Sequence, residues 1–421
     1  MKFISTRGSS PDVWVSEAII NGLAPDGGLY IPQVLPHLDM KHAPSYKDYP
    51  QLAHFVLSPF FEGDVLEDEL LDICKEAFNF PIPLHFHNKN EAVLELFHGP
   101  TAAFKDFGAR FLAITMERLL KKSDKKLTIL VATSGDTGGA VAAAFHKREN
   151  ICVKVLFPKG RVSARQEKQL TCYKDNITSF AVDGSFDDCQ KVVKEAFMDK
   201  ELSSKEGLTS ANSINLGRLL PQMVYAFSSS LEMKDKCHED ATVIIPSGNV
   251  GNSCASLYAK EMGAPIKSII LSVNSNTTIV DYINSGFYEG RASISTLANA
   301  MDVGDPSNME RIFYLYPTHE SFMRNLSAVS VSDDEIIESI SDVYKNHHYI
   351  VCPHTATGEK VRKDLSLIEP TIVYATAHAA KFETIVEPII NQIVEIPSSL
   401  SALLEKEQHY TSIKPDYHLL F

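Results

Sequence analysis

Short apolar runs rich in β-branched residues recur along the chain, and segments with a helical pattern separate them. The runs are LTILVA (127–132), ICVKVLF (151–157), TVIIP (242–246), SIILSV (268–273) and TIVYATA (371–377). A strand that is apolar at every position is buried on both faces, and helices that alternate with such strands cover a parallel sheet. The sequence therefore predicts the α/β class, with a mostly parallel sheet flanked by helices.

Two segments between these runs have the spacing of helices that bury one face. Residues 106–122 repeat apolar side chains at helical intervals, begin with an acid and end with two lysines, as the helix dipole favours. Residues 215–233 are similar, but Pro221 is expected to end or kink a turn because proline has no amide hydrogen.

The chain has 421 residues, 44% of them hydrophobic and 22% charged, which is typical of a globular protein of two or three domains. Its first part is rich in turn-forming residues and ends in the proline-containing stretch NFPIPLHF (79–86). We therefore expect an N-terminal region over residues 1–82 and a larger region over residues 83–421.

The formal net charge of −13 argues against sequence-independent binding of nucleic acid or of a membrane surface. Seven scattered cysteines without a CxxC pair fit a reducing compartment, and the histidines of LHFHN and KNHHY have no further ligand at metal-binding spacing. The N-terminus has no signal-peptide pattern, and no apolar run reaches the length of a membrane span. We expect a cytoplasmic protein without a metal.

Two glycine-rich loops repeat one pattern. ATSGDTGGAVAAAF (132–145) and PSGNVGNSCASLYA (246–259) each follow a predicted strand with Ser-Gly-x-x-Gly and then enter a helix of small residues. Unpaired amides at such a helix start bind anions, so each loop is a candidate anion site. Neither loop is a Rossmann or Walker motif, and each alone is also explained as a tight strand-to-helix turn.

Lys105, in HGPTAAFKDFGARF (98–111), stands at the start of a predicted helix, where the positive end of the helix dipole disfavours a cation. Most lysines are surface charges, but the apolar neighbours of this one suggest a partly desolvated amine with a lowered pKa. Such amines form Schiff bases. A Schiff-base lysine together with two anion sites suggests a phosphorylated carbonyl cofactor, of which pyridoxal phosphate is the commonest.

Several motifs, in one order from about Gly22 to Phe382, resemble the threonine synthase family, which belongs to the fold-type II (tryptophan-synthase-β-like) pyridoxal-phosphate enzymes. They are TAAFKDFGARF, TSGDTGGAV, PSGNVGN, NSINLGRLLPQ, AMDVGDPSN and TAHAAKF, and GLAPDGGLYIP resembles the N-terminal region of the shorter bacterial and fungal branch. The resemblance implies two open, twisted, mostly parallel sheets, an N-terminal threonine synthase region over 1–82, and a smaller mobile α/β subdomain at about 110–210.

The resemblance also implies roles for individual residues around the cofactor. Lys105 would form the Schiff base and shuttle protons, Thr376 would lie beside the pyridine nitrogen, and Asp136 would stand where many relatives have an asparagine that faces the ring hydroxyl. The cofactor phosphate would be held by Ser247, Gly248, Asn249, Val250, Gly251 and Asn252.

The substrate contacts are implied in the same way. Thr133, Ser134 and Thr137 would contact its carboxylate or its phosphate, and Asn212, Ser213 and Arg218 would recognise its phosphate. A planar guanidinium suits bidentate phosphate binding, although Arg218 is equally explained as a helix cap or salt-bridge partner. Lys159 and Arg161 are further, weaker candidates.

The implied reaction converts O-phospho-L-homoserine and water into L-threonine and inorganic phosphate, by β,γ-elimination and water addition at the β-carbon. A serine or threonine dehydratase, or a β-replacing synthase, would also need Lys105 and the cofactor loop, but not a phosphate clamp at Arg218. A catalytically silent homologue that binds pyridoxal phosphate is a third alternative. We expect a small-molecule substrate as partner, and a monomer or homodimer.

Overall fold

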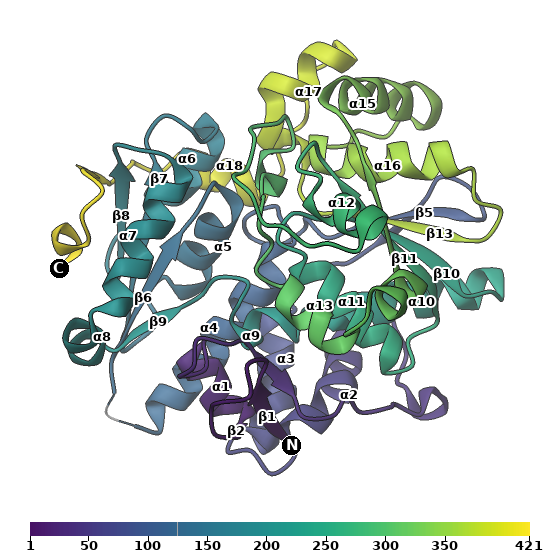
Figure 1. Ribbon diagram of the computed structural model, residues 1–421. Helices are drawn as coiled ribbons and strands as arrows, with labels where there is room; N and C mark the ends of the chain where they lie inside the picture. The colour runs from purple at the N-terminus through teal and green to yellow at the C-terminus, as the bar shows by residue number, and fades with distance from the viewer. Residues whose placement is uncertain (124) are drawn as a thin grey trace.

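All five apolar runs form strands, and they divide between two sheets (Figure 1). The computed structural model describes residues 1–123 and 125–421. The first two runs are β6 (Leu127–Ala132) and β7 (Ile151–Pro158) of one sheet. The other three are β10 (Ala241–Pro246), β11 (Ile266–Val273) and β13 (Thr371–Ala375) of the other sheet. The predicted α/β class is confirmed.

The larger sheet has six strands in the order β12-β11-β10-β13-β5-β4. Its remaining strands are β12 (Leu326–Ser330), β5 (Glu91–Glu95) and β4 (Leu84–Phe86). Only the β4–β5 pair is antiparallel among the pairings of this sheet in the described residues. The helices α10 (Gln222–Cys237) and α11 (Gly251–Glu261) cover one face, and α15 (Asp333–His347) and α16 (Pro353–Leu365) lie over the other (Figure 1).

The smaller sheet has five parallel strands in the order β14-β8-β7-β6-β9. Its remaining strands are β8 (Ile177–Val182), β9 (Leu208–Ser210) and β14 (Thr411–Ile413), and the flanking helices are α5 (Asp136–Phe145), α6 (Ala164–Thr171) and α7 (Phe186–Met198). The sequence did not predict β14, which brings the C-terminal end of the chain to the edge of this sheet (Figure 1).

The N-terminal region packs directly on α4 (Lys105–Lys121). It contains the antiparallel strands β1 (Lys2–Ser5), β2 (Val13–Trp14) and β3 (Tyr30–Pro32), and the helices α1 (Val15–Asn21), α2 (Tyr49–Phe61) and α3 (Leu70–Ala77). The ring of Phe78 lies 5.4 Å from that of Tyr49 and 6.1 Å from those of Phe107 and Phe111. One hydrophobic core therefore includes this region, α4 and strands of both sheets.

The connections are mostly short. They contain α8 (Lys200–Glu206), α9 (Leu216–Leu219), α12 (Thr278–Ser285), α13 (Met309–Leu315), α14 (His319–Asn325), α17 (Glu383–Ile390) and α18 (Ser398–Leu404), and the 3₁₀ turns η1 (Met40–His42), η2 (Glu67–Glu69), η3 (Asn299–Met301), η4 (Ala379–Phe382) and η5 (Tyr417–Leu420). The predicted break at Pro221 is confirmed, because α9 ends before it and α10 begins after it.

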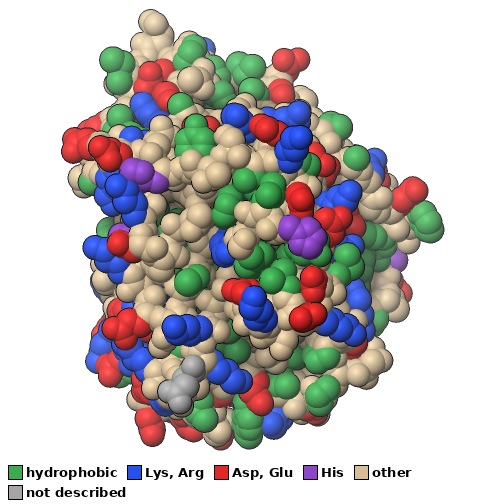
Figure 2. Space-filling model, turned by 90° about the vertical axis from the view of Figure 1, so that its left-hand side faces the viewer, with side chains coloured by type: hydrophobic (Ala, Val, Ile, Leu, Met, Phe, Trp, Pro, Cys, Tyr) green, Lys and Arg blue, Asp and Glu red, His purple; other side chains and the backbone are tan. Residues whose placement is uncertain are grey.

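Charged side chains of both signs are interspersed over the face that carries the smaller sheet and the C-terminus (Figure 2). No helix within residues 1–123 and 125–421 combines the length and the apolar character needed to cross a bilayer.

The aromatic contacts at Phe78 predict a strong effect of its removal. Phe78 is 3% exposed, and Phe78→Ala should destabilise the protein by about 3–5 kcal/mol because it opens a cavity between the N-terminal region and α4. The measurement is the shift of the urea unfolding midpoint of the cofactor-free protein. Phe287→Ala is the control, because Phe287 is 71% exposed and its truncation should change stability by less than about 0.5 kcal/mol. Equal effects would mean that the N-terminal region does not share this core.

Candidate active site

Lys105 reaches its position because the loop before α4 pairs with the chain that continues β13. The amide of Phe104 donates to Thr376 O at 2.8 Å, and the amide of His378 donates to Ala102 O at 3.0 Å. Ala102 has a φ of 54°, a left-handed conformation that turns the chain into α4. Lys105 is the first residue of α4, so its side chain starts at the carboxyl end of β13, close to Thr376.

The amine of Lys105 makes no hydrogen bond or ion pair with the described residues, and its Nζ lies 4.8 Å from the centre of the Phe104 ring. Burial lowers the pKa of Lys105 to about 8, and the positive charges of Arg218 and Lys381 act in the same direction. The carboxylate of Asp136 opposes them. A lysine in this state is neutral in a large fraction of molecules near pH 8, as a nucleophile or base must be.

The loop between β10 and α11 is the better candidate for an anion site of the two predicted loops. Val250 has a φ of 47°, and α11 begins at Gly251 without a side-chain cap. The amides of its first turn therefore have no side-chain acceptor from the N-cap residue, and the helix dipole adds positive potential. A Cβ on Gly248 would lie 2.6 Å from Met301 Cα, whereas a Cβ on Gly251 would meet no atom closer than 3.6 Å.

Side chains from two other segments hold this loop in place. Asn249 donates through Nδ2 to Ser213 Oγ at 2.6 Å. Asn308 donates through Nδ2 to Asn249 O at 3.1 Å and accepts at Oδ1 from Arg311 Nη1 at 2.6 Å. The buried Arg311 also donates to Tyr30 O at 3.1 Å, which connects the loop with the N-terminal region. Arg311 is thus a structural cation, a role that no sequence motif indicated.

In the other glycine loop, between β6 and α5, the hydroxyl of Thr133 forms hydrogen bonds with backbone groups of the loop itself. Thr133 Oγ1 accepts from the amides of Gly135 at 3.0 Å and Gly138 at 2.9 Å, and donates to Gly135 O. Asp136 begins α5, a position where the helix dipole stabilises a carboxylate. Asp136 also lines the same cavity as Lys105. The structure therefore gives Thr133 a role within the loop and places Asp136 at the cavity.

One cavity brings most of the predicted cofactor residues together. Its lining residues are Phe104, Lys105, Asp136, Ser213, Pro246, Gly248, Asn249, Val250, Gly251, Asn252, Ala300, Met301, His354 and Thr376. Eight residues named from the sequence do not line it, namely Thr133, Ser134, Thr137, Lys159, Arg161, Asn212, Arg218 and Ser247. Their proposed contacts with cofactor or substrate stay predictions.

Arg218 lies behind Lys105, packed against α4. It is 2% exposed, and its guanidinium donates to Ala211 O at 2.7 Å and to Lys105 O at 3.5 Å. Its Nε has no partner among the described residues, and no described carboxylate forms a salt bridge with it. Burial lowers the pKa of Arg218 to about 10. The helix salt bridge considered from the sequence is therefore not formed within the described residues.

Sequence reasoning missed His354 and Lys381. His354, at the start of α16, accepts at Nε2 from the amide of Ala300 at 3.0 Å. Burial lowers the pKa of His354 to about 4, so this ring is neutral at pH 7. Lys381 belongs to the motif TAHAAKF, but nothing in the sequence of this motif predicts that the lysine is buried. His354 carries no sequence signal.

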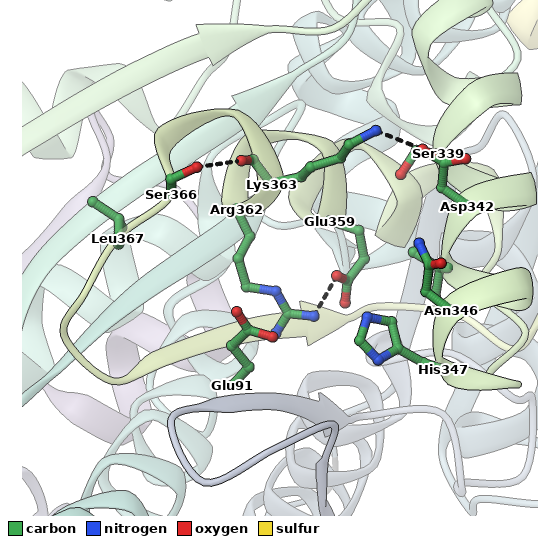
Figure 3. Close-up of a pocket in the computed structure, with 11 residues that line it drawn as sticks. Glu91, Ser339, Asp342, Asn346, His347, Glu359, Arg362, Lys363, Ser366 and Leu367 are labelled. Carbon is green, nitrogen blue, oxygen red and sulfur yellow. Dashed lines mark hydrogen bonds and ion pairs between the residues drawn. The ribbon is translucent and has the colours of Figure 1, made fainter.

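A larger cavity of about 440 Å³ lies between α15, α16 and β5 (Figure 3). Its charged side chains are largely paired with one another. Arg362 forms an ion pair with Glu359, and Lys363 Nζ lies 2.5 Å from Asp342 Oδ2. No residue that the sequence predicted for the site lines this cavity. The cavity at Lys105 is therefore the candidate active site.

The residues at this site fit pyridoxal phosphate. An amine of lowered pKa suits its aldehyde, the start of α11 without a side-chain cap suits its phosphate, and the hydroxyl of Thr376 suits its ring nitrogen. Phe104 and Met301 supply apolar walls.

Substitutions at the two glycines test the assignment of the phosphate site. Gly248→Ala should destabilise the cofactor-free protein by about 1–3 kcal/mol, because its Cβ collides with the backbone at Met301. Gly251→Ala should leave that stability unchanged but weaken pyridoxal phosphate binding, because the methyl group crowds the anion. The measurements are thermal unfolding without cofactor and titration of the visible absorbance with pyridoxal phosphate. Unchanged affinity in Gly251→Ala would contradict the assignment.

The lowered pKa of Lys105 predicts a pH dependence. The rate at which the cofactor-free protein captures pyridoxal phosphate should rise with pH and level off above about 8, because only the neutral amine attacks the aldehyde. Arg218→Met removes a charge that lowers this pKa, so the midpoint should move to higher pH. The control Arg324→Met changes an exposed arginine and should leave the midpoint where it is. A midpoint that stays or falls in Arg218→Met would refute the electrostatic explanation.

Comparison with known families agrees with the geometry. Residues 88–367 match the family model described as pyridoxal-phosphate dependent enzyme. Residues 2–78 match the model of the threonine synthase N terminus, and residues 355–420 match that of the threonine synthase C-terminal region. Together these models cover nearly the whole chain.

Curated relatives and solved structures are similar over their full length. Threonine synthase of Haemophilus influenzae is 39% identical over 95% of this chain and 94% of its own, and that of Escherichia coli is 37% identical over 95% and 94%. The structure of pyridoxal-phosphate-bound threonine synthase from Brucella melitensis has a TM-score of 0.92 and 34% identity, over 100% of this chain and 98% of its own. The yeast threonine synthase structure has a TM-score of 0.89 and 30% identity, over 100% and 97%. The chain belongs to the threonine synthase family of fold-type II lyases, whose cofactor is pyridoxal phosphate.

Proposed function

We propose that this chain converts O-phospho-L-homoserine and water into L-threonine and inorganic phosphate. The observation that carries the proposal is the amine of Lys105, which shares one cavity with the start of α11, in a chain that threonine synthases match from end to end. The threonine synthase models at both ends of the chain favour this reaction over that of other fold-type II lyases.

Lys105 is proposed to hold and move protons at Nζ. When bound, pyridoxal phosphate supplies an electron sink that eases proton removal next to the amino group of the substrate. With a pKa of about 8, Lys105 can accept a proton near neutral pH and return it later in the cycle. Asp136 and Thr376, which line the same cavity, are proposed to orient the cofactor from two sides.

The two phosphates are proposed to bind in separate places. The loop from Ser247 to Asn252 holds the cofactor phosphate through backbone amides, while Ser213, Asn212 and Arg218 recognise the substrate phosphate. Ser213 supports this division because its hydroxyl lines the cavity and accepts from Asn249 Nδ2 of the neighbouring loop at 2.6 Å. Arg218 supports it as a buried guanidinium without a carboxylate partner among the described residues. Ser134, Thr137 and the backbone at Thr133 are proposed to hold the substrate carboxylate.

Water must be kept out until elimination is complete, since early water entry would divert the reaction. We therefore propose that residues from about 110 to 210 close on the site as a unit. This segment contains β6 to β9, α5 and α6, and α5 carries Asp136 at its first position. The protein is further proposed to act in the cytoplasm, as a monomer or homodimer.

The reaction is tested by incubating the purified protein with pyridoxal phosphate and O-phospho-L-homoserine. Phosphate and threonine should appear in equal amounts. Lys105→Ala should lower turnover by about 10²–10⁴-fold, because it removes the acid–base group, and should abolish the lysine-dependent visible absorbance. Lys121→Ala at the other end of α4 is the matched control, because its side chain is exposed and should not affect either reading.

The dehydratase alternative predicts a different outcome of the same assay. Solved threonine deaminase of Solanum lycopersicum shares only 16% identity and a TM-score of 0.55 with this chain, which indicates a common fold and nothing finer. Deamination of threonine or serine without phosphate release from O-phospho-L-homoserine would replace the proposal with that alternative. Cofactor binding with neither reaction would indicate a catalytically silent homologue.

A further inference from the structure

A second lysine, Lys381, is completely buried next to the candidate site. It lies in η4, which follows β13, and its side chain is 0% exposed. Its Nζ lies 2.8 Å from Asp136 Oδ1 and donates to Thr101 O at 2.9 Å. A buried ammonium group is costly unless it is paired, so this position requires an anionic partner. The proposed reaction gives Lys381 no task so far.

Its partner Asp136 lines the cavity that contains Lys105. Gln166 donates through Nε2 to Asp136 Oδ1 at 3.1 Å, so this one oxygen receives both Gln166 and Lys381. No described residue forms a hydrogen bond with Oδ2 of Asp136. Burial raises the pKa of Asp136, but the charge and hydrogen bond of Lys381, together with smaller contributions from His354 and Gln166, hold this pKa below its ordinary value. The carboxylate therefore stays ionised and retains one oxygen for a donor inside the cavity.

Lys381 is the main source of this effect. The groups that bear on the pair from neighbouring elements are Lys105, Asp106, Arg165, Cys352, His354, His378 and Glu383. His354 and His378 both have a pKa of about 4, so they are neutral near pH 7. Lys105 loses its own charge as it reacts. Arg165 forms an ion pair with Glu383 at 3.3 Å, which leaves Lys381 as the permanent cation at Asp136.

The pair also joins the two sheets. Asp136 begins α5, which follows β6 of the smaller sheet, while Lys381 follows β13 of the larger sheet. Two neighbouring contacts cross the same boundary. Gln169 of α6 donates to Thr101 O at 3.1 Å, and the guanidinium of Arg165 donates to Ala380 O. Docking of α5 and α6 against the larger sheet thus brings the charge of Lys381 to Asp136.

We propose that Lys381 is a positioning residue that keeps the Asp136 carboxylate ionised and directed at the cofactor when α5 is docked. This inference rests on the proposed function, because the ionised carboxylate serves as acceptor for a donor on the cofactor or on the reacting substrate. Lys381 acts through Asp136 and need not touch either ligand.

The test uses the holoenzyme and the variants Lys381→Met, Asp136→Asn and the double variant that combines them. In Lys381→Met the buried carboxylate loses its cation, so the pKa of Asp136 rises. Below that raised pKa, turnover should fall about tenfold per pH unit, and the visible absorbance of the bound cofactor should titrate at the same pH. The double variant has no buried charge at either position, so it should lack this new inflection. Lys363→Met removes a lysine of an exposed ion pair and should have the wild-type profile.

A merely structural role predicts a different pattern. Turnover of Lys381→Met would then fall by the same factor at every pH, with no new titration of the cofactor absorbance, and this result would overturn the proposal. Lys381→Arg retains the charge and covers the case in which Lys381→Met does not fold. It should keep the wild-type pH profile even if its turnover is lower, and a new inflection in Lys381→Arg would equally overturn the proposal.

The absorbance titration separates this inference from the proposed function. If the holoenzyme does not act on O-phospho-L-homoserine, the proposed function fails, whereas the cofactor absorbance still reports whether Lys381 controls the protonation of Asp136. If turnover is present but neither reading acquires an inflection in Lys381→Met, the inference about Lys381 fails alone.

Discussion

The candidate site depends on a short stretch of backbone pairing at the carboxyl end of β13. Two hydrogen bonds join the loop around Ala102 to the chain around Thr376, and they fix where α4 begins. The position of Lys105 therefore follows from the sheet, because β13 lies in the middle of the larger sheet between β10 and β5. β10 runs parallel to β13, so the glycine loop that follows β10 leaves the sheet beside the carboxyl end of β13. The two neighbouring strands thus bring the amine of Lys105 close to the candidate anion site.

Cationic side chains outnumber ionised carboxylates at this site. Lys105, Arg218 and Lys381 are cationic groups, whereas Asp136 is the carboxylate that lines the cavity. Asp106 is a further buried acid, but burial raises its pKa and its oxygens are occupied by Thr101. The positive excess suits a cofactor and a substrate that both carry a phosphate. Because Arg218, Lys381 and Asp136 are buried, the potential acts over longer distances than it would at the surface.

The sequence predicted the features that depend on local pattern. The apolar runs became central strands because a fully buried strand must be apolar throughout, and Pro221 interrupted a helix because it lacks an amide hydrogen. Lys105 and the loop from Gly248 to Asn252 were identified because their immediate neighbours limit what they can do. The family resemblance added Thr376 and Asp136, which both line the cavity.

Features that depend on contacts between residues far apart in the sequence could not be predicted from local patterns. Lys381 looks like an ordinary surface lysine until Asp136 is placed beside it from a different sheet. Thr133 remains a predicted substrate contact, and only the structure shows that two amides of its own loop donate to its hydroxyl. His354 has no signal because a buried neutral histidine resembles any other histidine in sequence. The strands β9 and β14 are too short to show a period.

The late strand β14 has a consequence for how the chain is made. It pairs with β8 along the edge of the smaller sheet, although most of the larger sheet lies between them in sequence. During synthesis β8 leaves the ribosome long before β14, so its outer hydrogen-bonding groups remain open to other chains. The smaller sheet is complete only when β14 has been synthesised and has paired with β8. A truncated translation product would therefore lack that protection, and quality control could distinguish it from the finished protein by this exposed strand edge.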